Sequence, residues 1–163
     1  MKKNAIKIFF LYAGLLTIAG YAHGAQYPQG PDLQVTPGKL CDRPTKYRYP
    51  ENIAYCERDV VYSTKEIVIG EYDTKFNYKI ATLPREDFKI DHLIPLCAGG
   101  SNDIQNLWPQ HKTIYVITDP LEPILCAKMA QGRLKQADAV GLVIEAKTHL
   151  DRTKKIIEYI SRL

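Results

Sequence analysis

Apolar and polar residues alternate over residues 88–92, a pattern typical of a β-strand with one buried face. A second apolar pair, Leu107-Trp108, follows a polar stretch centred on the sequence Gly-Gly-Ser-Asn-Asp at 99–103. Glycine reaches positive φ freely, and Asn and Asp stabilise local turns, so the pattern predicts a strand, a loop and a short strand. The first strand places Phe88, Ile90 and His92 on one side and Lys89 and Asp91 on the other.

A helical pattern precedes this hairpin. Ser63 and Glu66 stand three residues apart, which is the capping-box signature of a helix start. The residues that follow place Ile69, Tyr72 and Phe76 on one helical face. We therefore predict a helix from residue 63 to about residue 77, packed over the hairpin.

The segment after the hairpin is harder to assign. Residues 114–117 are short, apolar and β-leaning. Asp119 followed by Pro120 reads as a helix entry, with the aspartate as N-cap. The expected helix has an apolar stripe and a C-terminal glycine: Leu121, Leu125, Met129 and Gly132.

A last helix is expected from about residue 135 to residue 159. Its apolar face consists of Val140, Val143, Ile144, Leu150, Ile157 and Ile160. Together the elements predict an α+β fold, in which one small hairpin lies among helices. There is no internal repeat, so residues 63–163 are expected to form one domain.

The N-terminal part divides into two segments. Residues 2–7 contain three lysines, residues 8–19 are mainly apolar, and small residues occupy positions −3 and −1 of a cleavage site after Gly24. This layout predicts a signal peptide over residues 1–24, because the apolar run is too short to span a bilayer comfortably. Residues 25–62 are rich in Pro and Gly and are expected to form an irregular arm.

Signal removal changes the charge balance. The chain has 22 basic and 18 acidic residues, a net charge of +4, and three of the lysines lie within residues 1–24. The mature chain therefore has 19 basic against 18 acidic residues, a net charge of +1. Global charge gives no evidence for a nucleic-acid partner, so affinity for phosphate must come from local groups.

Four cysteines remain after signal removal. An even number of cysteines in an exported protein favours disulfides over thiol chemistry. Four cysteines allow three pairings, among which we prefer a local pair and a pair that ties the hairpin loop to a later helix: Cys41–Cys56 and Cys97–Cys126. A cysteine zinc site is disfavoured because the chain has no Cys-x-x-Cys pair.

Residues 91–110 contain five characteristic dipeptides: Asp91-His92, Pro95-Leu96, Gly99-Gly100, Ser101-Asn102 and Asn106-Leu107. In these positions the chain resembles the HNH endonuclease family. The resemblance implies a ββα-metal core, in which a hairpin and a following helix hold one divalent cation. The segments Asn106–Gln110 and Asp119–Glu122, with Gly132, further resemble a branch of secreted bacterial HNH proteins that contain disulfides.

The resemblance also implies roles for three residues. His92 would be the general base that activates a water, a task that suits imidazole because its ordinary pKa is about 6.5. Asp91 would be a metal ligand, and the cation would act as a Lewis acid on the phosphate and the departing 3′ oxygen. Asn106 would cross the hairpin to hold the loop and orient His92. Gly99 and Gly100 would allow a tight turn.

The sequence departs from the family at the last metal ligand. HNH proteins usually supply a His or Asn from the helix, and residues 114–117 contain neither. Asp119 is our preferred substitute because a carboxylate oxygen suits magnesium, although it serves equally well as a plain N-cap. His111 is the second choice. The expected cofactor is a divalent ion, with magnesium first and manganese or zinc as alternatives.

The predicted function is therefore an exported endonuclease, periplasmic or secreted, that is metal-dependent and has low sequence specificity. Its expected substrate is DNA, with RNA as a second substrate, and the mature protein is expected to be a monomer with no membrane association. The main alternative is a non-catalytic secreted binding module that keeps the ββα scaffold. A hydrolase of another substrate is the third hypothesis, because fold does not fix function.

Overall fold

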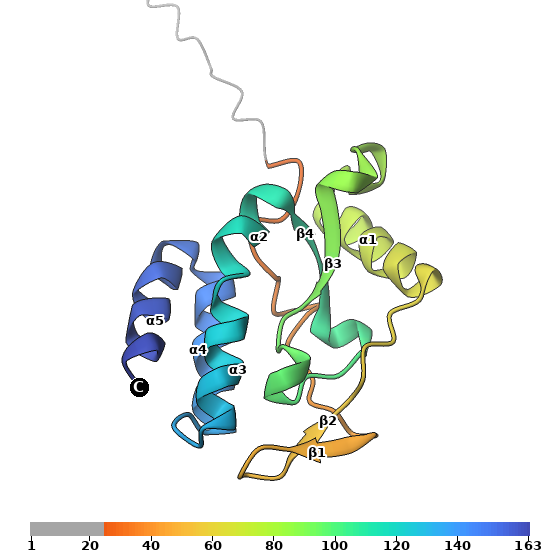
Figure 1. The fold of residues 1–163 in the computed structure, drawn as a ribbon. Coiled ribbons are helices and arrows are strands. Elements are labelled where there is room, and N and C mark those ends of the chain that lie inside the picture. Colours follow the sequence, from red (N-terminus) through yellow and green to blue (C-terminus); the bar gives the residue numbers. More distant parts are fainter. Residues whose placement is uncertain (1–24) are drawn as a thin grey trace, which may run out of the picture.

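The computed structural model describes residues 25–163, and the predicted signal peptide lies outside the described residues. Helices and strands are mixed, as the α+β prediction required. In Figure 1 the β3–β4 hairpin lies in the centre, with α1 on one side and α3, α4 and α5 grouped on the other. Within residues 25–163, no helix is both long and apolar enough to cross a bilayer.

The central hairpin pairs β3 (Phe88–His92) with β4 (Leu107–His111) in antiparallel register. His92 lies opposite Leu107, and Phe88 lies opposite His111. The predicted first strand is confirmed with its bounds. The second strand extends three residues beyond the predicted pair, and all five of its residues are buried.

The helix predicted before the hairpin is confirmed as α1 (Tyr62–Phe76), but its predicted capping box is wrong. Val61 is the N-cap and makes no side-chain capping bond, so Ser63 already lies inside the helix. The buried face of α1 packs on β4, where it covers Trp108. This face consists of Val68, Ile69 and Tyr72.

The segment after the hairpin forms two short helices, α2 (Lys112–Thr118) and α3 (Leu121–Ala130). The β-leaning interpretation of residues 114–117 is wrong, because Ile114 packs into the core formed by α1 and the hairpin, and that tertiary contact overrides local propensity. Asp119 is not the N-cap of α3. It is the C-cap of α2 with helical dihedrals, and Pro120 occupies the N-cap position.

The single helix predicted over residues 135–159 is two helices, α4 (Gln136–Thr148) and α5 (Leu150–Arg162). His149 separates them with φ −133° and ψ 80°, which lies outside the helical region. The break lets α5 fold back onto α4 and α3, which buries Ile156 and Ile160. No glycine or proline marks the break in the sequence.

The arm contains a small hairpin of β1 (Lys46–Arg48) and β2 (Ile53–Tyr55), which the sequence did not predict. The rest of the arm is irregular, as expected, and runs beside the loop between β3 and β4, residues 93–106, which is called the motif loop from here on. The Cys41 amide donates to the Gly99 carbonyl over 2.8 Å, and the Ser101 amide donates to the Lys39 carbonyl over 2.9 Å. The arm is therefore part of the surroundings of the motif.

Both predicted disulfides are present, Cys41–Cys56 and Cys97–Cys126. The first closes the arm on itself, and the second ties the motif loop to α3. Two disulfides are compatible with a secreted or periplasmic protein. The Cys97–Cys126 bridge encloses residues 98–125, which include the second half of the motif at residues 91–110.

We expect removal of the Cys97–Cys126 bridge to destabilise the protein by about 3 kcal/mol. The bridge links cysteines 29 residues apart and thereby restricts the conformations of the unfolded chain. Urea unfolding of the Cys97→Ser/Cys126→Ser double variant measures this change. The oxidised wild-type chain is the control. A loss close to zero would show that the bridge does not stabilise the protein.

Candidate functional site

His92 and Asp91 end the strand β3 at the point where the chain enters the motif loop. Both side chains are largely buried, with His92 3% exposed and Asp91 7% exposed. They lie between two apolar clusters, one around α1 and the hairpin and one among α3, α4, α5 and the loop. The hairpin thus delivers an imidazole and a carboxylate into a low-dielectric part of the molecule.

Asn106 holds the motif loop in shape. Its side-chain amide accepts from the Ile94 amide over 2.9 Å and donates to the carbonyls of Ile94 and Ser101 over 3.0 and 2.9 Å. The side chain is fully buried, so these bonds form in a low-dielectric setting. Asn106 makes no hydrogen bond to the His92 ring among those the structure shows; other residues orient the ring.

Two glycines allow the loop to close. Gly99 has φ +86°, a conformation that L residues rarely adopt. A Cβ on Gly100 would collide with the Ile94 carbonyl oxygen. The predicted tight turn at these two positions is present.

The His92 ring is held at both nitrogens. Arg58 Nη1 lies 3.2 Å from Nδ1, and Asn102 Oδ1 lies 3.0 Å from Nε2. A guanidinium only donates hydrogen bonds, so Nδ1 must accept, and the proton of the neutral ring resides on Nε2. The basic lone pair of His92 therefore points at Arg58.

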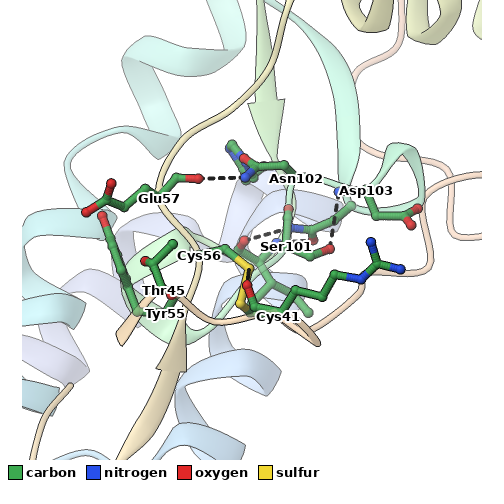
Figure 2. The surroundings of a disulfide bond; sticks show 12 residues. Cys41, Thr45, Tyr55, Cys56, Glu57, Ser101, Asn102 and Asp103 are labelled. Carbon is green, nitrogen blue, oxygen red and sulfur yellow. Dashed lines mark hydrogen bonds between the residues drawn. A yellow bond between two sulfur atoms is a disulfide. The ribbon is translucent and has the colours of Figure 1, made fainter. Parts of the chain in front are cut away.

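Asn102 is itself fixed, and this fixes the His92 tautomer. Its Nδ2 donates to the Glu57 carbonyl over 2.6 Å, which leaves Oδ1 as the atom that faces His92. Figure 2 shows this bond beside Cys56 and its disulfide to Cys41. Arg58 directly follows Glu57 in the sequence, so the disulfide and the Asn102 bond together place Arg58 at the imidazole.

Burial lowers the pKa of His92 to about 4 from its ordinary value of about 6.5, and the neighbouring Arg58 cation contributes in the same direction. The Asn102 contact and the Asp91 charge act the opposite way but do not compensate. His92 is therefore an uncharged base at neutral pH.

Asp91 is bound by a buried lysine. Lys147 of α4 donates from Nζ to Asp91 Oδ2 over 2.7 Å, to the His92 carbonyl over 2.6 Å and to Glu122 Oε1 over 3.0 Å. These three acceptors use all three ammonium protons. Lys147 is 1% exposed, so the ion pair is shielded from solvent.

The ammonium and carboxylate groups around Asp91 stabilise one another in their charged forms. Burial by itself would raise the pKa of Asp91, but the Lys147 and Lys89 ammonium groups hold the pKa of that carboxyl below its ordinary value. Burial by itself would lower the pKa of Lys147, and the two carboxylates raise it instead. Asp91 is therefore an anion and Lys147 a cation at neutral pH.

Neither of the two alternative candidates for the last metal ligand, Asp119 and His111, contacts Asp91 directly. Asp119 Oδ1 accepts from Lys89 Nζ over 2.6 Å, and the same Nζ lies 3.4 Å from Asp91 Oδ1, so Asp119 reaches Asp91 only through an ammonium. His111 is at the opposite end of the hairpin, where its ring stacks on Tyr27 at a centroid distance of 3.9 Å.

The side chains present do not fit a resident divalent ion in this arrangement. Among residues 25–163, no three His, Cys, Asp or Glu side chains gather into a set that could hold a metal. Both Asp91 oxygens already face an ammonium, from Lys147 and from Lys89. The magnesium ion predicted at Asp91 and Asp119 thus finds no support in the geometry.

His92 opens onto a small cleft of about 150 Å³. The cleft is lined by three charged side chains, the neutral imidazole and a disulfide: Arg58, Asp91, Glu122, His92, Cys97 and Cys126. A larger cleft of about 740 Å³ shares Arg58 with it. Its other charges are mixed and include Lys39, Arg43, Asp42, Glu57, Asp59 and Asp103.

The basic residues of the arm are mostly engaged within the protein. Lys39 pairs with Asp103 over 2.6 Å, and Lys46 pairs with Glu57 over 2.9 Å. The Arg48 guanidinium lies 3.4 Å from the centroid of the Tyr55 ring. The arm therefore offers fewer free cations than its composition indicates.

Sequence reasoning missed Arg58, Lys147 and the role of Asn102 at His92. Lys147 carried a signal, because it follows Val143 by four residues and therefore lies on the apolar face of its helix, where a lysine needs partners. Arg58 carried no such signal. It comes from an irregular segment, and its contact with residue 92 is purely tertiary.

Comparison with known proteins adds no assignment: no family model, no curated protein and no solved structure matches this chain.

The first prediction from this site concerns pH. The folded-state pKa of His92 lies below its unfolded value, so the unfolded chain binds the proton first and His92 favours the folded state fully only above about pH 6.5. We expect this contribution, about 3 kcal/mol at most, to be lost as the pH falls from about 6.5 to about 4. Urea unfolding across this range measures it.

The matched control is His92→Gln, which should flatten that part of the stability profile. NMR titration of the wild-type ring provides an independent readout. A His92 ring that titrates at its ordinary pKa would contradict the burial argument.

The second prediction concerns the buried lysine. Lys147→Met leaves Asp91 buried beside Glu122 without the ammonium, and we expect a loss of about 3–5 kcal/mol in the free energy of unfolding. Lys155→Met, at an exposed position on α5, should change it by no more than about 0.5 kcal/mol. Equal effects of the two substitutions would show that the buried ion pair contributes nothing.

Proposed function

We propose that this chain is an exported endonuclease of the HNH type that hydrolyses phosphodiester bonds of DNA, with RNA as a second substrate. One observation carries the proposal: a buried, uncharged imidazole in the lining of a cleft has its basic Nδ1 directed at an arginine. A general base beside a phosphate-binding cation is the pairing that phosphodiester hydrolysis needs.

Arg58 supports the binding of a phosphodiester. A guanidinium presents a planar fork that matches two phosphate oxygens, and Arg58 is the cation shared by both clefts. In the free protein its Nη1 bonds His92 and its Nη2 donates to the Ile90 carbonyl over 2.9 Å. A bound phosphate competes for Nη1, and its capture releases the lone pair of His92.

The freed Nδ1 then removes a proton from a water whose oxygen attacks phosphorus. The bond from phosphorus to the 3′ oxygen breaks, and the leaving oxygen takes a proton from solvent, which yields a 5′ phosphate and a 3′ hydroxyl. The negative phosphate next to the ring raises the pKa of His92 toward neutrality, so the bound substrate itself strengthens the base. Asn102 keeps the proton on Nε2 and the base on Nδ1.

The arrangement of β3, β4 and the helices that follow supports a ββα scaffold for this site. The hairpin supplies His92 and Asp91, and α3 supplies Glu122 at the edge of the same cleft. The cleft also contains the Cys97–Cys126 bridge, which favours action in an oxidising compartment such as the periplasm or the exterior.

A specific observation favours a second candidate, a secreted binding module without catalysis. Both His92 nitrogens and both Asp91 oxygens already have partners inside the protein. If Arg58 never leaves His92, the site holds a phosphate but activates no water.

Plasmid cleavage by the oxidised mature protein tests the proposal, with and without added magnesium or manganese and with and without a chelator. We expect fragments of many lengths. His92→Ala should lower the rate by about 10²–10⁴-fold, because it removes the general base. Arg58→Ala should lower it by about 10²–10³-fold, the effect of losing one charge-stabilising donor.

Lys155→Ala is the surface control and should cleave at the wild-type rate. Circular dichroism confirms that each variant is folded. Binding of DNA without cleavage in every condition would favour the binding module, and equal rates for wild type and His92→Ala would remove His92 from its role.

A further inference from the structure

We propose that the Lys147 ammonium is the resident cation of this site and takes the place of a divalent metal ion. The inference concerns what the oxygen atoms at the end of β3 bind, and it does not depend on the nuclease proposal.

Lys147 Nζ sits in a cage of three oxygens. They come from two carboxylates and one backbone carbonyl: Asp91 Oδ2, Glu122 Oε1 and His92 O, at 2.7, 3.0 and 2.6 Å. Carboxylate and carbonyl oxygens are the ligands that magnesium, manganese and calcium prefer. The cage therefore has the chemistry of a hard-cation site, and an ammonium fills it.

Each ammonium group of the cluster already has two carboxylate partners. Lys147 contacts Asp91 and Glu122, and Lys89 contacts Asp91 and Asp119. A divalent ion bound to Asp91 would add two positive charges within a few ångströms of two ammonium groups. Repulsion at that distance in a buried setting costs far more than at an exposed surface.

Displacement of the lysine is also costly. Its side chain is 1% exposed, and it projects from the last turn of α4, on the buried face that also carries Val143 and Ala146. Removal of the ammonium from the cage leaves a buried charge without acceptors, which is strongly unfavourable in proteins generally. Exposed lysines can swing away from a metal; this one has no solvent to enter.

The cage also gives Lys147 a positioning role. Its bond to the His92 carbonyl fixes the backbone from which the imidazole projects, and its bond to Glu122 joins α4 to α3. Charge stabilisation at the phosphate then comes from Arg58, which borders the cleft directly. Under the nuclease proposal, cleavage would persist in the presence of a chelator.

Manganese is the probe for the test. Calorimetry with the oxidised wild-type protein should show no manganese uptake, and the paramagnetic ion should leave the NMR signals of the Asp91 and His92 amides unbroadened. Uptake of one manganese ion with broadening of these signals would overturn the proposal.

Two substitutions make the test sharper. Lys147→Ala empties the cage and leaves three oxygens, so it should take up one manganese ion under conditions in which the wild type takes up none. Lys147→Met also removes the charge but fills the space, and it should bind no better than the wild type. Failure of a folded Lys147→Ala protein to bind manganese would show that the cage is not a cation site.

Should Lys147→Ala not fold, the wild-type measurement decides alone. Absence of uptake by the wild type supports the proposal, and uptake overturns it. The result is separable from the nuclease test. DNA cleavage in the absence of metal supports both proposals, and metal-dependent cleavage with manganese bound at Asp91 overturns only the proposal about Lys147. If the protein neither cleaves DNA nor takes up metal, only the nuclease proposal is overturned.

Discussion

The ion pair between Lys147 and Asp91 is the constraint on which the rest of the site depends. A buried lysine is stable only if its charge is matched and its protons are bonded, and here one carboxylate of the hairpin, one carboxylate of α3 and one carbonyl of β3 meet both needs. These partners lie between the two apolar clusters of the protein. The hairpin and the C-terminal helices are thus joined by a polar contact whose geometry leaves little freedom to His92.

The imidazole is controlled from a third part of the chain. The N-terminal arm is closed by Cys41–Cys56 and bonded to the motif loop, and it brings Arg58 to Nδ1 while Asn102 holds Nε2. The His92 ring therefore belongs to the hairpin and contacts residues of both the arm and the motif loop. Its low pKa follows from burial and from the nearby guanidinium, and both would change when a phosphate enters the cleft.

Local patterns predicted the parts of the fold that local chemistry determines. The alternation at 88–92 and the Gly-Gly turn defined the hairpin, and the apolar stripe at Leu121, Leu125 and Met129 defined α3. The sequence could not reveal the helix at 112–118, the break at His149 or the contacts of Arg58, because each depends on packing between segments far apart in the chain. The metal expected from the motif depended on Asp91 being free, and Lys147, 56 residues away, binds it.

A crystal structure of the oxidised mature protein grown with manganese and a short non-hydrolysable oligonucleotide tests the account most directly. The account predicts a phosphate on Arg58, a His92 Nδ1 released from the guanidinium, and Lys147 Nζ still between Asp91 and Glu122 without manganese. Manganese bound to Asp91, with Lys147 displaced from its three oxygens, would contradict it.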